Sequence, residues 1–342
     1  MLTILLGLFS AFAFASDLRA QTPLYQGKTI SIVVGTSAGS TYDVYARAIA
    51  QYLGKHIPGN PNILVQNMAG AGSLISANYV YGVAKPDGLT LASINPALYF
   101  NQLAGRKEVQ FDWAKFAWIG SPDRSEHLIY MRADSPFKTI HDVRRASEPP
   151  KCGATGTGTT GHYMPRLIEE TIGAKFNIVL GYPGGPEVDL AVERGEIHCR
   201  AFTLAAWVSG ELYRTWRANG FTRVLIQTGR KRDPRLPEVP TLFELMSEVK
   251  TEDVPFRLAA VVLASNAFGR PYVVHPGTPS EQVNILREGF MKTFADPEFL
   301  ADAKKRNTDI EPTSGAELEK LAKEVMVQPP AVIERMKKLL GI

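Results

Sequence analysis

The sequence is poor in cysteine, has no block of basic residues and, after its first twenty residues, contains no long apolar run. Cys152 and Cys199 are its only cysteines, and their spacing matches no metal-binding motif. The formal net charge of +4 is spread along the chain, which argues against nucleic acid as a partner. A membrane-spanning helix needs ~18 or more uncharged apolar residues, and no later segment has them. We therefore expect a protein that uses no cofactor or metal and is not embedded in a membrane.

The first residues form an apolar segment that is too short to cross a bilayer. Residues 2–15 carry no charge and have the length typical of the apolar core of a signal peptide. Small residues offer cleavage points after Ala15 and after Ala20. Because the usual basic head is absent, either the start codon lies upstream of Met1 or the signal is atypical. We expect an exported protein located in the periplasm, where the two cysteines would meet an oxidising environment.

Extended apolar runs alternate with helical patterns along most of the chain. With 342 residues and a hydrophobic fraction of 45%, the chain is globular and long enough for two domains. Glycine-rich or small-residue turns end the runs, and the repeated strand–turn–helix units predict mostly parallel sheets flanked by helices. The predicted strands are residues 30–34, 62–66, 89–94, 128–131, 152–154, 177–180, 197–202 and 224–227.

The strand–turn–helix pattern restarts in the middle of the chain and returns at its end. We predict an α/β fold in which residues 21–124 and 258–342 form one lobe and residues 125–257 form the other, joined by two crossings. Residues 257–263 are predicted to be extended, and residues 316–339 to be a helix interrupted by two prolines. Because α/β sheets bind ligands at the carboxyl ends of their strands, the crevice between the lobes is the expected site.

A strand, a tight loop and a helix are predicted between residues 30 and 53. Apolar β-branched residues form the strand, and an apolar face recurs at helical spacing from Tyr42 to Leu53. Ser40 followed by Asp43 is similar to a capping box at the helix start. The loop of small residues leaves backbone N–H groups unpaired in front of the helix. A carboxylate or phosphate can dock there without a lysine or arginine.

A second glycine-rich loop stands before the helix predicted at residues 163–172. Residues 156–161 match the G-x-G-x-x-G pattern of dinucleotide sites. The next strand ends without an aspartate or glutamate that could hold a ribose hydroxyl, which argues against NAD as a ligand. Two interpretations stay open for this loop: a tight turn with close packing, and an anion site formed by N–H groups and threonine hydroxyls.

The first loop also fits an enzyme motif. Residues 35–39 satisfy the G-x-S-x-G pattern of a hydrolase nucleophile elbow, with Ser37 as the nucleophile. In α/β-hydrolases several strands precede the elbow, whereas here it follows the first strand, and no downstream histidine lies in a recognisable partner motif. We favour a binding protein that is not an enzyme, and a secreted serine hydrolase using Ser37 is the alternative.

Several other side chains fit either a structural or a ligand-contacting role. Asp43 is favoured as a carboxylate that complements the helix N-terminus over a ligand contact. His162 fits a helix start, Tyr182 a core or a crevice-facing position, and Arg200 a salt bridge or a pair with a bound acid. If the second lobe has the common strand order, its first strand lies beside its third and brings the two cysteines together. A disulfide between them would then depend on their geometry.

Short motifs follow one another along the chain in a specific order. They are the loop and helix at residues 35–47, Val-x-Asn-x-x-Gly-Ala-Gly at residues 65–72, Pro-Asp-Gly-x-Thr-Leu at residues 86–91, the glycine-rich loops at residues 156–162 and 181–185, Val-Pro-Thr at residues 239–241 with Glu244, and Pro-Gly-Thr-Pro at residues 276–279. In this order they resemble the periplasmic solute-binding proteins of tripartite tricarboxylate transporters, the Bug receptors. The sequence departs from the paired glycines usual in the family's first loop, and it has Thr159 and Thr160 in place of the usual serine.

The resemblance implies a two-lobe periplasmic binding protein fold, similar to type II, that closes on a small carboxylate-containing solute and delivers it to a membrane permease. We expect a monomer whose partners are a small organic anion and the permease subunits. A periplasmic ligand sensor is a further alternative. The candidate ligand-binding residues are Thr36, Ser37, Ala38, Gly39, Ser40, Thr41, Asp43, Asn67, Gly156, Thr157, Gly158, Thr159, Thr160, His162, Tyr182 and Arg200.

Overall fold

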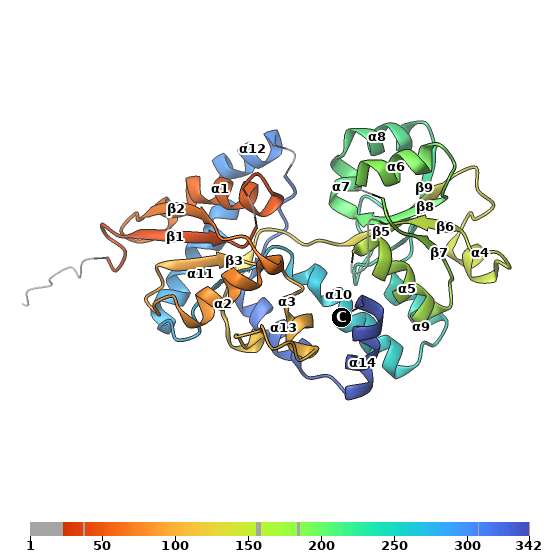
Figure 1. The fold of residues 1–342 in the computed structure, drawn as a ribbon. Helices are drawn as coiled ribbons and strands as arrows, with labels where there is room; N and C mark the ends of the chain where they lie inside the picture. The colour runs from red at the N-terminus through yellow and green to blue at the C-terminus, as the bar shows by residue number, and fades with distance from the viewer. Residues whose placement is uncertain (1–22, 37, 155–158, 183–184, 307, 342) are drawn as a thin grey trace, which may run out of the picture.

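Two lobes stand side by side in the computed structural model, which describes residues 23–36, 38–154, 159–182, 185–306 and 308–341 (Figure 1). Each lobe contains a sheet with helices on both faces. Within the described ranges, every helix is too short or too polar to cross a bilayer. The predicted α/β class and two-lobe architecture are confirmed.

The sheet of lobe 1 is mixed. Its strand order is β11 (Thr313–Ser314), β4 (Ala117–Ser121), β10 (Tyr272–Val274), β3 (Thr90–Ser93), β1 (Thr29–Val34) and β2 (Asn62–Asn67). β1 pairs in parallel with β2 and β3, whereas β10 is antiparallel to both of its neighbours because it enters the sheet on the return from lobe 2. The carboxyl ends of β1, β2 and β3 face lobe 2 (Figure 1).

Helices cover both faces of this sheet. α1 (Thr41–Leu53), α11 (Ser280–Ala295) and α12 (Pro297–Lys305) share a core with Ile30, Ile32 and Val34 of β1. α2 (Leu74–Gly82), α3 (Leu98–Leu103) and α13 (Gly315–Met326) cover the opposite face. Short 3₁₀ turns are η1 (Gly54–His56), η2 (Ala71–Ser73) and η3 (Trp113–Lys115). Ile30, Ile32 and Val34 are two residues apart, so their side chains lie on the same face of β1 and enter one core.

The sheet of lobe 2 has the strand order β7 (Asn177–Val179), β6 (Lys151–Gly153), β8 (Cys199–Thr203), β5 (His127–Arg132) and β9 (Thr222–Gln227). β6 pairs in parallel with β7 and β8, and β5 is antiparallel to β8 and β9. α6 (Gly185–Glu193), α7 (Leu204–Ser209) and α8 (Glu211–Ala218) pack on one face, and α5 (Thr160–Ile172) and α9 (Leu242–Glu248) on the other. α4 (Ile140–Arg145) lies far from lobe 1 (Figure 1).

The two cysteines lie on neighbouring strands of lobe 2. Cys152 of β6 is directly opposite Cys199 of β8 in the parallel register. Both side chains are buried, and both thiols are free. The strand order on which this neighbourhood depends is therefore confirmed, and the structure contains no disulfide among the residues it describes.

One predicted strand is wrong. Residues 257–263 are helical and belong to α10 (Asp253–Phe268), which carries the chain from lobe 2 back to lobe 1. Leu258, Ala259 and Val262 are buried along with most of the helix, because both lobes pack around it. A helix that is apolar on nearly all sides has no helical periodicity, and its sequence is indistinguishable from that of a buried strand.

The interrupted C-terminal helix is confirmed as α13 followed by α14 (Pro330–Leu340). α14 packs against α10 and against α5 of lobe 2. The C-terminal end of the chain thus lies where the two lobes join (Figure 1).

The chain passes between the lobes at residues 122–126 and again through α10. The N–H of Ser125 donates to the carbonyl of Asn266 at 2.9 Å, so the two crossings are hydrogen-bonded to each other. Gly269 follows α10 with φ of +59°, and a Cβ there would lie 1.9 Å from the carbonyl oxygen of Asp123. Only glycine fits at this contact, which holds both crossings at one place between the lobes.

Candidate functional site

The first predicted loop leads from β1 into α1. Ser40 is the N-cap residue: its Oγ accepts from the N–H of Asp43 at 3.3 Å and shares a hydrogen bond of 2.6 Å with Thr36 Oγ1. Ala38, Gly39 and Thr41 are exposed at the start of the helix. The helix therefore begins at the surface that faces lobe 2, where its first N–H groups can receive an anion.

The carboxylate of Asp43 holds this loop in shape. Oδ2 accepts from the N–H of Gly39 at 2.9 Å and from Nε of Arg47 at 3.0 Å, and Oδ1 accepts from the amide of Asn67 at 2.9 Å. Asp43 is only 3% exposed. The hydrogen bond from Arg47 is the main reason why the pKa of Asp43 is lowered to about 2. Asp43 and Asn67, both candidate ligand contacts, are thus bound to each other.

Asn67 also joins the first loop to the turn that follows β2. Its amide donates to the carbonyl of Thr36 at 3.1 Å, and its Oδ1 accepts from Arg47 at 3.1 Å. The amide group therefore bridges α1 and β2, and a change at Asn67 would alter the first loop even without a direct solute contact.

The turn after β2 has a strained backbone. Ala71 and Ser73 both have positive φ, at 45° and 76°, and they flank Gly72 at 63°. The hydroxyl of Ser73 donates to the carbonyl of Gly35 at 3.0 Å, and a Cβ on Gly35 would lie 2.5 Å from that hydroxyl. Such conformations in non-glycine residues cost free energy and are concentrated at ligand-binding sites. The loop before α1 and the turn after β2 are therefore hydrogen-bonded to each other.

Lobe 2 presents a second helix start. α5 begins at Thr160 after the N-cap residue Thr159, and the Thr160 hydroxyl lies 3.4 Å from Nε2 of His127 on β5. A cavity of about 190 Å³ opens beside this helix start. Its lining residues are Gly153, Ala154, Thr159, Thr160, Gly161, Val188, Arg200, Ala201, Phe202 and Thr203.

His127 contacts the start of α5, although its sequence context did not identify it as a candidate ligand-binding residue. It stands at the beginning of β5, and no motif surrounds it in the sequence. Burial lowers the pKa of His127 to about 4, so that its imidazole is neutral at pH 7 and can orient the Thr160 hydroxyl without adding charge. Only the pairing of distant segments brings this ring to the start of α5.

His162 is the third residue of α5 and is buried. Its Nε2 accepts a hydrogen bond from Nε of Arg166 at 3.1 Å. Burial, with a smaller contribution from the charge of Arg166, lowers the pKa of His162. The imidazole therefore accepts a hydrogen bond within its own helix, as expected for a residue at a helix start.

Arg200 on β8 forms the salt bridge that was one of its two predicted roles. Its Nη1 lies 2.7 Å from Oδ2 of the buried Asp189, whose carboxylate also accepts from Tyr130 and Tyr213. The guanidinium stacks on the ring of Phe202 with its Cζ 4.2 Å from the ring centroid. Arg200 also lines the cavity beside α5, where the ion pair with Asp189 holds its guanidinium in a fixed position.

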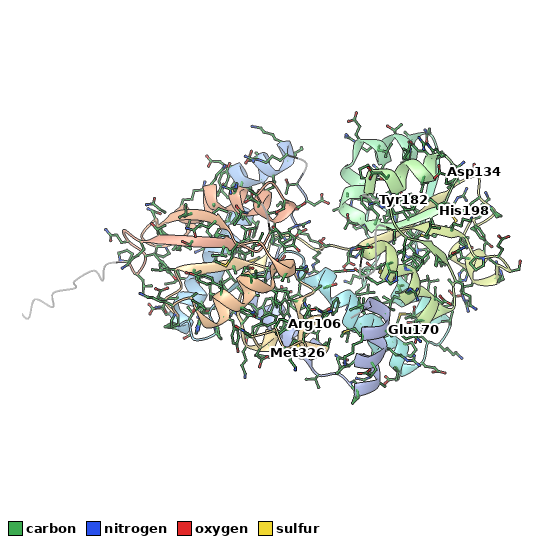
Figure 2. The ribbon with its side chains drawn as sticks, viewed as in Figure 1. Arg106, Asp134, Glu170, Tyr182, His198 and Met326 are labelled. Atoms are coloured by element: carbon green, nitrogen blue, oxygen red, sulfur yellow. The ribbon has the colours of Figure 1, made fainter. Side chains whose placement is uncertain are left out.

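Tyr182 lies at the end of β7 in lobe 2 (Figure 2). Its ring packs beside Gly153, where a Cβ would lie 3.3 Å from Cε2 of the tyrosine. The side chain is half-buried and borders the same strand ends as the cavity beside α5. Among the predicted site residues, Ser37, Gly156, Thr157 and Gly158 lie outside the described residues.

Hollows lie between the lobes on two sides of the crossings. One has a volume of about 220 Å³ and is lined by Ala71, Gly72, Asn95 and neighbouring residues of lobe 1 and by Tyr163 of α5. The other has a volume of about 390 Å³ and is lined by Asp123, Arg124 and Glu126 of the first crossing and by segments of both lobes. In the hollow of about 220 Å³, the turn after β2 of lobe 1 and α5 of lobe 2 thus line one space.

Hydrogen-bonding groups lie beside the two helix starts. Within the part of the chain that the structure describes, no three His, Cys, Asp or Glu side chains are grouped so that they could hold a metal ion. The hydrogen-bonding groups are threonine and serine hydroxyls, the neutral imidazole of His127 and the guanidinium of Arg200, and they stand near the N-termini of α1 and α5. These are donors suited to an anionic group.

A known protein family matches most of the chain. Residues 45–338 match the model of the Tripartite tricarboxylate transporter family receptor, TctC. The chain is 27% identical over 329 residues to the UPF0065 protein in gbd 5'region of Cupriavidus necator. The matched region covers 94% of this chain and 91% of that protein.

Solved structures share the fold. A TctC solute binding protein from Polaromonas has a TM-score of 0.72 at 22% identity, over 93% of this chain and 99% of that one. MatC from Rhodopseudomonas palustris with bound malate has a TM-score of 0.56 at 18% identity, over 92% and 99%. Because the family model spans most of the sequence, the chain belongs to the family of tripartite tricarboxylate transporter receptors.

Proposed function

We propose that this protein captures a small carboxylate-containing solute between its lobes and delivers it to a tripartite tricarboxylate-type permease. The observation that carries the proposal is the placement of two helix starts, those of α1 and α5, on the facing sides of the lobes. A helix start favours an anion through the N–H groups and dipole of its first turn, and threonine or serine hydroxyls lie beside both starts. MatC, which has the same fold, has malate bound, and this supports a carboxylate as the solute.

The solute would favour a closed state of the two lobes. Contacts from lobe 1 and lobe 2 to the same anion are available only when the two helix starts approach each other. The solute then shifts the equilibrium by its difference in affinity for the two states. The crossings at residues 122–126 and at Gly269 are the segments about which the lobes would move. Closure excludes water and strengthens each charge-assisted hydrogen bond.

We further propose that the receptor works as a monomer in the periplasm, after export by an N-terminal signal peptide, and that it is not an enzyme. Membership of a receptor family favours this reading over the hydrolase that uses Ser37. Labelling of Ser37 by a fluorophosphonate probe would support the hydrolase instead. A periplasmic sensor would use the same cleft and differ only in its partner.

A charge placed at the start of α5 tests the proposed site. The solute is first identified by thermal-shift screening of the purified protein against a panel of organic acids. Thr160→Asp then places a carboxylate where the solute's carboxylate is expected, so that calorimetry should show a loss of affinity of more than roughly tenfold, since like charges repel strongly in a closed site.

The matched control is Thr215→Asp, which places the same charge on the exposed surface of α8. This variant should bind the solute as the wild-type protein does. Unchanged affinity in Thr160→Asp would contradict the placement of the site, and the absence of binding by every organic acid in the panel would contradict the proposed function.

A further inference from the structure

The hollow of about 390 Å³ beside the crossings differs in charge from the cavity at α5. It is lined by Asp123, Arg124 and Glu126 of the first crossing, by the start of α7, by the loop after β9 and by residues 309–311 of lobe 1. Thr203 lines the cavity at α5, and Leu204, the next residue, lines this hollow. The two spaces are therefore close to each other at the end of β8.

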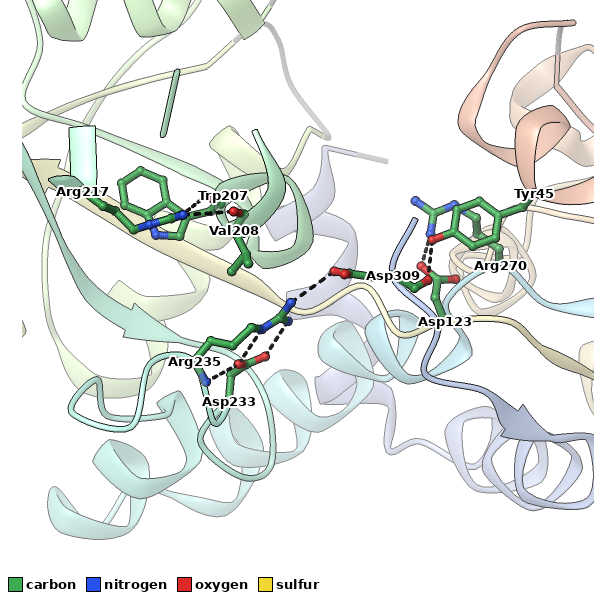
Figure 3. Close-up of polar contacts among 9 residues, drawn as sticks. All are labelled: Tyr45, Asp123, Trp207, Val208, Arg217, Asp233, Arg235, Arg270 and Asp309. Atoms are coloured by element: carbon green, nitrogen blue, oxygen red, sulfur yellow. Dashed lines mark hydrogen bonds and ion pairs between the residues drawn. The ribbon is translucent and has the colours of Figure 1, made fainter. Parts of the chain in front are cut away.

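Carboxylates outnumber guanidinium groups in this lining. Among the described residues that line the hollow, the acidic ones are Asp123, Glu126, Asp233, Asp309 and Glu311, and the basic ones are Arg124 and Arg235. Arg235 lies 2.8 Å from Asp233 and 3.3 Å from Asp309, which brings residues of both lobes together (Figure 3). Arg124 lies 3.5 Å from Glu311. The cations of the lining are thus already paired.

Asp123 is the most buried of these acids. It is 2% exposed and pairs through Oδ2 with Arg270, which lies behind it against Tyr45 (Figure 3). Its Oδ1 is buried and has no hydrogen-bond partner among the described residues. A buried carboxylate oxygen without a donor costs free energy, and it marks a place where a donor from outside the chain would be stabilised.

Glu126 is a second carboxylate of the hollow, and unlike Asp123 it forms no ion pair among the described residues. Its Oε2 accepts from the Thr228 hydroxyl at 2.9 Å and from the amide of Asn266 at 3.3 Å. Within the described ranges it has no lysine or arginine at ion-pair distance. Burial raises the pKa of both Glu126 and Asp123, that of Asp123 to about 6. A positive charge in the hollow would therefore stabilise both ionised carboxylates.

A further arginine nearby does not neutralise the hollow. Burial lowers the pKa of Arg217, and the nearby charges of Arg214 and Arg235 lower it further. Arg217 is therefore close to Arg235. Its guanidinium is engaged at the end of α7, where it donates to the carbonyls of Trp207 and Val208 (Figure 3). It does not line the space beside Asp123.

We propose that this hollow receives a protonated amine of the solute, and that the receptor binds an amino-carboxylate rather than a simple carboxylate. The inference rests on the proposed function, because it places the carboxylate of the same molecule at the start of α5. Glu126, Asp123 and Asp309 receive the ammonium group at the other end. The number of carbon atoms between the carboxylate and the ammonium group of the solute then determines which solute fits.

Matched pairs of small acids test the inference. The probes are 3-aminopropanoate, 4-aminobutanoate, 5-aminopentanoate and 6-aminohexanoate, each compared with the unsubstituted acid of the same length by calorimetry at pH 7. For at least one length, the amino acid should bind roughly tenfold or more tightly than its partner, as expected for hydrogen bonds to a charged group in a partly buried site.

Glu126→Gln keeps the hydrogen-bonding shape of the residue and removes its charge. This variant should reduce the amine preference by roughly tenfold and leave the affinity for the unsubstituted acid within about twofold. Glu334→Gln on the exposed surface of α14, where Glu334 pairs with Lys337, is the matched control and should keep the preference.

The outcomes separate the two proposals. If both members of every pair bind equally, the inference is overturned and the proposed function stands. The same holds if the preference for the amine is unchanged in Glu126→Gln. Absence of binding by all eight probes and by the wider organic-acid panel overturns the proposed function, on which the inference depends.

Discussion

Replacing Asp43 by alanine tests whether a buried carboxylate at the start of α1 holds the first loop. The variant loses the acceptor for the N–H of Gly39, the amide of Asn67 and Nε of Arg47, at distances of 2.9, 2.9 and 3.0 Å. Hydrogen bonds to a charged group each contribute about 1.5–3 kcal/mol, but Arg47 is half-exposed and its share is screened by water. We expect the free energy of unfolding to fall by about 2 kcal/mol.

The chain offers a matched control for this variant. Asp253 and Arg257 form the same i,i+4 pair in the first turn of α10, at 2.8 Å, but both side chains are exposed. Asp253→Ala should lower the free energy of unfolding by less than about 0.5 kcal/mol. Urea denaturation of both variants measures the difference, and calorimetry with the solute should show weaker binding for Asp43→Ala alone. Equal losses of stability in the two variants would refute the argument from burial.

The pH dependence of stability gives an independent test of Asp43. Its pKa is lowered from 3.8 to about 2 in the folded protein, so the stabilising effect is fully present above pH 4, where the carboxylate is ionised in both states. The effect is lost as the pH falls from about 4 to about 2, because protons then bind preferentially to the unfolded chain. The stability difference between wild-type protein and Asp43→Ala should shrink over this range. A difference that stays constant down to pH 2 would show that the charge of Asp43 contributes nothing.

Two further variants test the junction between the lobes. Gly269→Ala should cost more than about 2 kcal/mol, because its Cβ would lie 1.9 Å from the carbonyl of Asp123 at a φ of +59°. Gly220→Ala, with φ of +68° and no atom within 4 Å, should cost only about 1 kcal/mol of backbone strain, so similar losses by thermal denaturation would contradict the contact. Leu258→Ala removes a side chain that is 0% exposed in α10 and should cost about 2–5 kcal/mol in urea denaturation; a cost below 1 kcal/mol would contradict its burial.

The elements around the first loop were predictable because their signals are local. The β-branched strand, the small residues of the loop and the Ser40 cap all act within a few residues, and the structure forms β1, the loop and α1 at the expected places. The same holds for α13 and α14, which proline separates. In contrast, α10 was predicted as a strand, because its burial by both lobes removes the polar face that identifies a helix.

The site was predictable only in part for a related reason. Loops that contain glycine and threonine before a helix can be recognised in sequence, and the start of α5 lines a cavity as expected. His127 and Asp123 carry no such signal, since neither lies in a motif and each meets its partners across more than thirty residues of chain or across a lobe boundary. The roles of Asp43 and Arg200 were open in sequence, and the structure shows both in ion pairs.

The sequence by itself determined the alternation of strands and helices, the small-residue loops before α1 and α5 and the order of motifs that places the chain in its family. These follow from short-range chemistry: side-chain periodicity, helix capping and the backbone freedom of glycine. Tertiary structure alone decided that Cys152 lies opposite Cys199, that Asp43 bonds to Asn67 and that carboxylates line the hollow beside the crossings. Those facts depend on strand order and on how two lobes meet, which are set by the packing of residues that are distant along the chain.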